Sequence, residues 1–341
     1  MKMKLMFALL GLALATGTLS GQQKDVKEQT IDLTPFGFHG GSCSGKVYFL
    51  DDNRLILSTP MMKKCGKDTW WNAKPTRFTV IDLQGKAITT KDRSDVVEAH
   101  EGPLGYAAVC TEKSIELIYS DLTTATTIPE NDHPCFYIGQ VSPSRTAIEI
   151  SGHLFQGSSP NPIAEVHLTK GSQVVGITDT GFAICSPEGY LTCAHFTVNG
   201  VDWKGDSSWE QNLRHVLFLT PQELLLPDDI RTQPLAAVHS DGTQTQISFL
   251  SKLRPPYINT INLNISAVAP RRILYYVTGC YLGDFDDCYF VTYHKFAVFD
   301  SQTHQTLFQH DVDGDSGPII SPNGHIVADL DGTDLHLYDI P

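Results

Sequence analysis

The sequence lacks the short motifs that mark most enzyme classes. It contains no G-x-S-x-G motif around a nucleophilic serine, no phosphate-binding P-loop and no glycine-rich dinucleotide fingerprint. It also contains no C-x-x-C pair and no cluster of Cys and His at the spacing of a zinc site. No catalytic residue is therefore indicated, and the sequence alone does not define a reaction.

Basic residues and long apolar segments are also scarce. The chain has 25 Lys+Arg against 38 Asp+Glu, which gives a net charge of −13. Nucleic acids and anionic membranes select basic surfaces, so this balance argues against both as partners. Beyond the first residues, no segment stays apolar for the ~18 residues that a membrane-spanning helix needs. We therefore expect no nucleic-acid partner and no membrane span.

Residues 1–21 have the pattern of a secretory signal peptide. Two early lysines precede the apolar stretch Leu5–Ala15, which is too short to cross a bilayer, and small residues follow it. Cleavage after Gly17 or Gly21 would remove both lysines and bring the net charge to −15. The pattern is typical of bacterial leaders and predicts secretion or a periplasmic location, with an uncleaved anchor as the alternative.

One pattern is present seven times: a short apolar run, a polar turn of about four residues and a second apolar run. From the first turn to the last, the mean period is 45 residues. A period near 40–50 residues with several short strands per unit is typical of the blades of a β-propeller. The turns begin at Asp51, Thr111, Ser142, Ser186, Thr220, Ala269 and Ser321.

Most units continue into a third and a fourth extended run, which makes a four-stranded blade. The last unit ends at Pro341 after its third run, and Glu28–Leu33 has no partner in its own unit. We expect this N-terminal segment to supply the missing strand, because closing the ring removes open edges at which a sheet would otherwise aggregate. The sequence therefore predicts an all-β fold, in which residues 22–341 form a single β-propeller of seven four-stranded blades closed by an N-terminal strand. Six or eight blades remain compatible with the spacing.

Three turns share the form S-P-x-x, and the chain ends in a short strand. They read SPSR (142–145), SPEG (186–189) and SPNG (321–324), and the end reads DGTDLHLYDIP. These segments resemble the turns and terminal strand of bacterial secreted WD40-like, YVTN-type β-propeller repeat proteins. The resemblance covers most of residues 28–341 and implies the fold, but not an activity, because such folds include scaffolds, hydrolases, lyases and redox enzymes.

All eight cysteines follow the leader, and an even number in an exported chain indicates disulfides. Strand geometry predicts two bonds, because the members of each pair lie at the same end of one blade: Cys280–Cys288 and Cys43–Cys65. The pairing of the other four is open. One arrangement joins Cys135 to Cys193 and leaves two buried thiols, Cys110 and Cys185.

Four histidines precede the first strand of a predicted unit, where entry loops surround the central channel of a propeller. They are His39, His100, His133 and His310, and Glu101 follows one of them. Imidazoles and carboxylates that converge on a channel can bind a ligand or a transition metal. The spacing predicts that His39, His100 and His310 share one rim. Under the alternative interpretation, they are polar turn residues hydrogen-bonded to the backbone.

Two further groups are candidate binding residues. Asp311, Asp313 and Asp315 place carboxylates at alternate positions, as in a calcium-binding loop, although the rest of an EF-hand is missing. Trp70 and Trp71 are adjacent aromatic residues that can stack on a sugar or anchor a protein partner. As a structural alternative, the three aspartates form a solvated acidic loop. For the two tryptophans, the structural alternative is an aromatic cap on the blade.

These observations favour a secreted, non-catalytic β-propeller that acts as a ligand- or protein-binding module. The alternative is a propeller hydrolase or lyase with a metal-assisted site at the channel mouth. We expect a monomer with a protein or carbohydrate ligand. No cofactor is firmly indicated, and a divalent cation is the one candidate.

Overall fold

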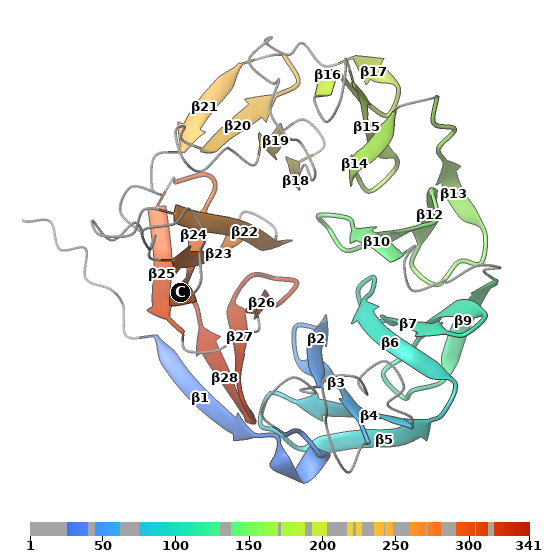
Figure 1. Cartoon of the computed structure of the whole chain (residues 1–341), viewed down its shortest axis with the longest axis vertical. Coiled ribbons are helices and arrows are strands. Elements are labelled where there is room, and N and C mark those ends of the chain that lie inside the picture. Colours follow the sequence, from blue (N-terminus) through green and yellow to red (C-terminus); the bar gives the residue numbers. More distant parts are fainter. Residues whose placement is uncertain are drawn as a thin grey trace, which may run out of the picture.

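The computed structural model describes residues 26–39, 45–61, 75–129, 138–169, 172–187, 193–202, 217–220, 223–226, 235–241, 243–247, 260–269, 272–280, 291–303, 305–312 and 317–341. The predicted signal peptide, residues 1–21, lies outside them. Apart from the 3-10 helix η1 (Thr34–Phe36), every element of the described residues is a β-strand. The strands form seven four-stranded antiparallel sheets, which follow one another around a common axis as a single ring (Figure 1). The prediction of an all-β single propeller is confirmed.

We name each sheet by its innermost strand. The β2 sheet consists of β2 (Lys46–Asp51), β3 (Arg54–Pro60), β4 (Thr76–Asp82) and β5 (Ala87–Arg93). The β6 sheet consists of β6 (Val96–Glu101), β7 (Ala107–Thr111), β8 (Ser114–Ile118) and β9 (Thr124–Pro129). The β10 sheet consists of β10 (Ile138–Val141), β11 (Ala147–Ile150), β12 (His153–Gln156) and β13 (Pro162–Glu165).

The remaining sheets complete the ring. The β14 sheet consists of β14 (Gln173–Ile177), β15 (Phe182–Pro187), β16 (Cys193–Val198) and β17 (Val201–Asp202). The β18 sheet consists of β18 (Leu217–Thr220), β19 (Glu223–Leu226), β20 (Leu235–His239) and β21 (Gln244–Ile247). The β22 sheet consists of β22 (Thr260–Ala269), β23 (Arg272–Cys280), β24 (Val291–Asp300) and β25 (Gln305–Asp311). The β26 sheet consists of β26 (Ile319–Ile320), β27 (Ile326–Asp331), β28 (Asp334–Asp339) and β1 (Lys27–Asp32).

The hydrophobic core lies between neighbouring sheets. Because side chains alternate between the two faces of a strand, one strand can contribute to both of its interfaces. On β2, Val47 and Phe49 pack against the β26 sheet, whereas Leu50 belongs to the cluster that faces the β6 sheet. The apolar alternation of β2 therefore holds its sheet to the sheets on both sides.

Serine side chains stabilise two of the S-P-x-x turns. The Ser142 hydroxyl accepts a hydrogen bond from the backbone N–H of Ala147 at 3.0 Å, and the Ser321 hydroxyl accepts one from Ile326 at 2.9 Å. Both serines are buried, so each hydroxyl satisfies a backbone donor that water would not reach. Both segments connect the first and second strands of a sheet, as the sequence predicted for SPSR and SPNG.

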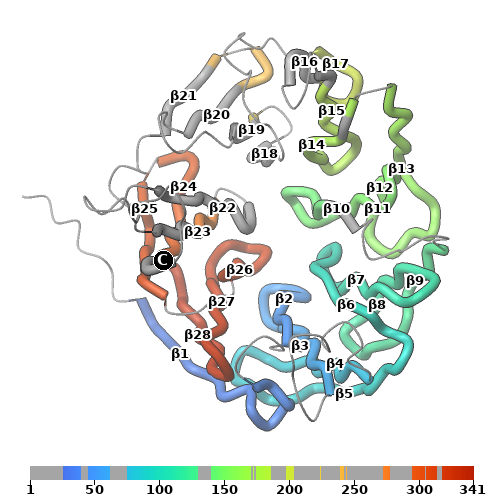
Figure 2. The backbone as a smooth tube through the Cα atoms, viewed as in Figure 1, coloured from blue at the N-terminus to red at the C-terminus, as the bar shows by residue number. Residues whose placement is uncertain are grey.

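The N-terminal strand closes the ring, as predicted. β1 pairs with β28 at six positions, from Lys27 opposite Asp339 to Asp32 opposite Asp334. In Figure 2 the blue N-terminal strand runs beside the red C-terminal sheet. Leu33 and Phe38 follow the strand and are fully buried against the β2 and β26 sheets. The first and last parts of the chain thus share one sheet and one core.

The order of strands differs from the sequence interpretation in two sheets. As the first apolar runs of their units, Tyr106–Cys110 and Phe182–Cys185 were expected to be innermost. The first run ends on β7 and the second lies on β15, and both strands are second in their sheets. The innermost strands are instead β6 and β14. β6 is hard to recognise because Glu98 and His100 interrupt its apolar residues. The prediction was therefore wrong about which strands line the axis in these two sheets.

The β26 sheet contains a buried acid. Asp329 on β27 is 3 % exposed, and within the described part of the chain its Oδ1 atom has no hydrogen-bond partner. Burial, with a smaller contribution from Asp331, raises the pKa of Asp329 to about 6, although His336 opposes this shift. The folded protein therefore binds this proton more tightly than the unfolded chain. This contribution to stability is complete below about pH 4 and is lost as the pH rises through about 6.

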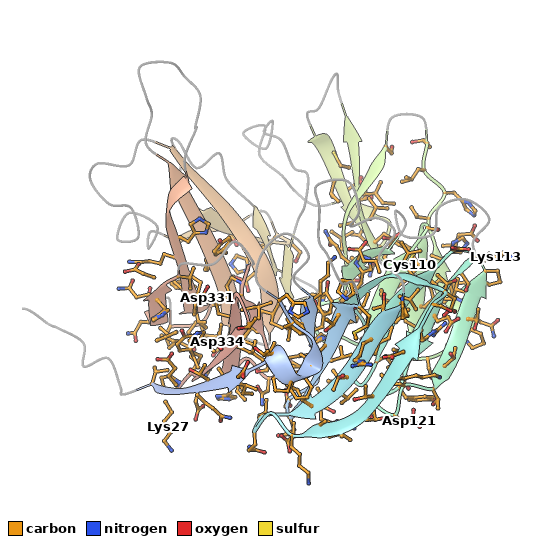
Figure 3. All side chains as sticks on the ribbon, turned by 60° about the horizontal axis from the view of Figure 1, so that its bottom comes forward. Lys27, Cys110, Lys113, Asp121, Asp331 and Asp334 are labelled. Carbon is orange, nitrogen blue, oxygen red and sulfur yellow. The ribbon has the colours of Figure 1, made fainter. Side chains whose placement is uncertain are left out.

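We expect the substitution Asp329→Asn to stabilise the protein at neutral pH, because it removes a buried charge. The gain should be about 1–3 kcal/mol at about pH 7.5 and close to zero at about pH 4. Urea denaturation at the two pH values measures it. Asp331→Asn is the control, since Asp331 is exposed on the same strand and is labelled in Figure 3. An equal effect of Asp329→Asn at both pH values would contradict the expectation.

Candidate functional site

Polar side chains meet across two neighbouring innermost strands, β2 and β6. Lys46 on β2 forms an ion pair with Glu98 on β6, and Glu98 Oε2 lies 3.5 Å from His100 Nε2. The side chains of Lys46, Glu98 and His100 are 47 %, 35 % and 26 % exposed. Glu98 therefore links a cation and an imidazole on the inner wall of the ring. We call these three residues the inner-wall cluster.

The inner-wall cluster has a defined charge state at its centre. The His100 contact lowers the pKa of Glu98 most and Lys46 lowers it further, so that it falls to about 2 despite partial burial. Glu98 is therefore a carboxylate at any physiological pH. The contact at 3.5 Å is at the limit of a hydrogen bond, and the buried Nε2 atom of His100 has no better partner among the described residues.

Tyr48 on β2 adds a phenol close to the cluster. Burial raises its pKa most, and the nearby carboxylates of Glu98 and Glu101 raise it further. The hydroxyl therefore keeps its proton and can donate a hydrogen bond. Together these residues offer an ammonium group, an imidazole, a phenol and two carboxylates, which suit the binding of a polar ligand that carries both donors and acceptors.

A buried arginine supports the end of this wall. Arg145 lies in the turn between β10 and β11 and its side chain is 7 % exposed. Its Nη2 atom donates to the carbonyl oxygens of Phe49 at 2.9 Å and Gly102 at 3.2 Å, and lies 3.0 Å from Glu101 Oε1. One guanidinium group therefore connects the β10 sheet to the two sheets that carry the inner-wall cluster.

The structure places the predicted histidines in different surroundings. His100 and Glu101 lie on the innermost strand β6, whereas His39 is exposed after η1. His310 lies on β25, an outermost strand, where its ring is 4.9 Å from that of Tyr338 and stacks on Phe308 at 6.1 Å. The structure therefore does not bring the three histidines together. The prediction used the number of residues between each histidine and the turn of its unit. These turns are not equivalent, because Thr111 is at the end of the second strand of its sheet, whereas Ser321 follows the first strand.

Several predicted site residues lie outside the described residues: His133, Trp70, Trp71, Asp313 and Asp315. Asp311 is described at the end of β25, where its side chain is 74 % exposed and lies 3.1 Å from Lys295 Nζ. Within the described ranges, no three His, Cys, Asp or Glu side chains are grouped so that they could hold a metal ion.

The structure defines the bonding state of two of the four cysteines whose pairing the sequence left open. Cys110 and Cys185 are both disulfide-bonded, and no cysteine in the described part of the chain is free. Their interpretation as buried thiols is therefore wrong. The predicted pairs Cys280–Cys288 and Cys43–Cys65 stay predictions, because Cys43, Cys65, Cys288 and the side chain of Cys280 lie outside what is described.

The sequence interpretation missed Lys46, Tyr48, Glu98 and Arg145. The signal for Glu98 was present, because the segment V-V-E-A-H-E alternates polar and apolar residues as an exposed strand does. The other three meet β6 only through the ring arrangement of the sheets, which no local pattern shows. Among the described residues, no helix is long and apolar enough to cross a membrane.

No protein-family model and no curated protein matches the chain. Solved structures to which it is similar include a chain of the mitotic checkpoint complex, with 10% identity, a TM-score of 0.47 and 99% of each chain covered. The WD40 domain of SCAP from fission yeast has 12% identity and a TM-score of 0.40, over 88% of this chain and 81% of that one. BamB from Moraxella catarrhalis has 8% identity and a TM-score of 0.35, over 85% and 83%. At these values the likeness to WD40 and other β-propeller proteins concerns the fold alone.

Proposed function

We propose that this chain is a binding module whose seven sheets are the seven blades of one closed propeller, and whose ligand contacts the inner-wall cluster. The observation that carries the proposal is the half-exposed line of Lys46, Glu98 and His100 on two adjacent innermost strands. Exposed ion pairs contribute little to stability, usually less than about 1 kcal/mol. A line of such groups on the inner wall is therefore better explained by recognition than by folding.

The chemistry of the wall fits a segment of a protein partner. A peptide presents backbone donors and acceptors together with side chains of both signs, and these complement an ammonium group, a carboxylate and an imidazole. The leader pattern of residues 1–21 supports a secreted or periplasmic location for this binding. We propose a monomer, because neighbouring sheets of the closed ring cover each other's faces and leave only short outer edges for pairing with a second copy.

Catalysis has less support than binding. The metal-assisted hydrolase or lyase depended in part on the acidic run that begins at Asp311, and Asp311 is paired with Lys295. The inner-wall cluster contains groups that can transfer protons, but nothing among the described residues places a nucleophile beside them. Binding therefore remains the function that the geometry favours.

A capture experiment with matched variants tests this function. Immobilised mature protein is exposed to the extracellular and periplasmic fractions of the source cells, and each retained component is purified and titrated by calorimetry. We expect Lys46→Ala to weaken the binding of the specific component roughly 5- to 100-fold, as loss of a central interface residue does.

Lys113→Ala is the matched control. Lys113 is an exposed lysine in the turn between β7 and β8, and Figure 3 shows it at the edge of the sheet beyond Cys110. Equal binding by the wild type and by the Lys46→Ala and His100→Ala variants would refute the assignment of recognition to the inner wall.

A further inference from the structure

Two sets of turns share one face of the ring. In an antiparallel four-stranded sheet, the turn between the first and second strands and the turn between the third and fourth strands lie at the same end. Contacts between sheets agree with this, since Arg54 Nη1 at the start of β3 donates to Ser120 Oγ in the β8–β9 turn at 2.6 Å. We call this side of the molecule the turn face.

An apolar patch lies on the turn face of the β6 sheet. It consists of Leu104 and Tyr106 from the β6–β7 connection and Tyr119 from the β8–β9 turn. Leu104 is 48 % exposed and Tyr119 is 41 % exposed. The rings of Tyr106 and Tyr119 lie 5.1 Å apart at an angle of 44°. Leucine and tyrosine side chains left in water at one spot are typical of a protein-binding site.

The backbone beneath the patch is fixed by hydrogen bonds to both neighbouring sheets. The Leu104 N–H donates to the Arg145 carbonyl oxygen at 2.8 Å, and the Gly105 N–H donates to the Leu50 carbonyl oxygen at 2.7 Å. A surface held in this way loses little conformational entropy when a partner binds, which favours affinity.

Carboxylates recur around the turn face, and one of them lies in the sheet that carries the patch. Four of the turns between third and fourth strands contain an aspartate that accepts a hydrogen bond from a backbone N–H two residues later: Asp82, Asp121, Asp241 and Asp300. Asp121 is exposed and lies two residues after Tyr119. Hydrogen bonds from Thr123 lower the pKa of Asp121, so this carboxylate stays charged.

The arginines at these turns form hydrogen bonds or ion pairs with other residues of the chain. Arg54 is bonded to Asp51 and Ser120, and Arg145 is buried. Arg272 donates to carbonyl oxygens at the C-terminal end of the chain, including that of Pro341 at 2.7 Å. Lys86 in the β4–β5 turn is exposed, and Lys91 donates to the carbonyl oxygen of Leu122. The patch therefore lies beside the exposed carboxylate of Asp121, whose pKa the nearby Lys91 also lowers, on a chain with a net charge of −13.

We propose that the turn face of the β6 sheet docks a basic segment of a partner protein. In this complex one apolar side chain of the segment packs against Leu104, Tyr106 and Tyr119, and a Lys or Arg beside it pairs with Asp121. The site uses none of the inner-wall cluster, so it is a second surface and goes beyond the function proposed above. Its ligand is defined by the aromatic patch and by the sign of the charge around it.

Selection from a display library of random peptides tests this proposal on the full mature chain. Because the library contains acidic, neutral and basic peptides, the charge of the enriched peptides shows which chemistry the protein binds. We expect enriched peptides that combine Lys or Arg with Leu or an aromatic residue. The enriched peptide is then synthesised with a fluorescent label, and its binding is followed by anisotropy. Leu104→Asp should weaken binding at least about tenfold, because it removes the apolar contact. Added salt should also weaken binding, because it screens the ion pair with Asp121.

Two variants serve as controls. Ile88→Asp places the same new charge on another exposed apolar residue, which is 52 % exposed on the outermost strand β5, and it should leave binding unchanged. Lys46→Ala should also leave it unchanged, which separates this site from the inner wall. Tyr119→Ser is a second patch variant, and thermal melting of each variant shows that it is folded.

Three results would overturn the proposal. The first is enrichment of acidic peptides, or of peptides that bind the wild type and the Leu104→Asp variant equally. The second is a selection that yields no peptide whose binding depends on Leu104 or Tyr119. The third is dimerisation of the chain, measured by analytical ultracentrifugation, that Leu104→Asp abolishes, because the patch would then be covered by a second copy.

Discussion

Removal of residues 22–34 should lower the free energy of unfolding by roughly 3–6 kcal/mol. The truncated chain loses β1, which pairs with β28 at six positions. It also loses two side chains of the core between the β2 and β26 sheets, Ile31 at 7 % and Leu33 at 0 % exposure. Burying a side chain of this size contributes about 1.5–3 kcal/mol. Urea denaturation of the full mature chain and of the truncated chain measures the difference.

A point variant and its control separate strand pairing from core burial. The substitution Leu33→Ala keeps β1 but removes part of the core, so it should account for about half of the loss. Gln29→Ala removes only an exposed hydrogen bond to the carbonyl oxygen of Leu83, and should cost less than about 1 kcal/mol. If the truncated chain unfolds at the same urea concentration as the full mature chain, closure by β1 does not contribute to stability.

The closed ring could be predicted because it follows from local patterns that accumulate along the chain. Each sheet is built from consecutive hairpins, so apolar runs and turn residues are enough to suggest it. The exception to this local order is β1, and it was found because Glu28–Leu33 had no partner and the last unit lacked a fourth run. Because the sequence repeats, a strand that is missing from one unit or left over beside another can be recognised.

The strands that line the axis were harder to predict. An innermost strand lies next to the central axis of the ring. Polar residues that interrupt its apolar pattern are therefore a consequence of this position. The segment that forms β6 was left unassigned for this reason, and the count of strands in its sheet began one strand late. His100 and Glu101 were singled out as loop residues, although they lie on β6.

Arg145 shows most clearly what a local pattern leaves out. The sequence interpretation used it only as the last residue of the turn S-P-S-R, and a turn residue is ordinarily exposed. In the structure its side chain is buried and crosses to two other sheets. These contacts join residues 43 to 96 positions apart, as the separations from Gly102 and Phe49 give. No spacing rule within one unit predicts contacts of that range.

The substitution Arg145→Ala should lower the free energy of unfolding by about 2–4 kcal/mol, because each buried acceptor that is left without its donor costs about 1–3 kcal/mol. It leaves the carbonyl oxygens of Phe49 and Gly102 without their donor, and it leaves Glu101 without a neighbouring cation. Arg145→Lys keeps the positive charge but should recover only part of this loss, because the shorter lysine side chain does not place its ammonium group where Nη2 contacts its three acceptors. Urea denaturation of each variant measures the change.

Arg54→Ala is the matched control for this prediction. Arg54 directly follows a turn between first and second strands and also pairs with a carboxylate, Asp51, but its side chain is 36 % exposed. Water can replace what it loses, so the cost should be less than about 1 kcal/mol. If both arginine variants lose the same small amount of stability, the guanidinium of Arg145 does not hold the three sheets together, and the inner wall is supported by apolar packing alone.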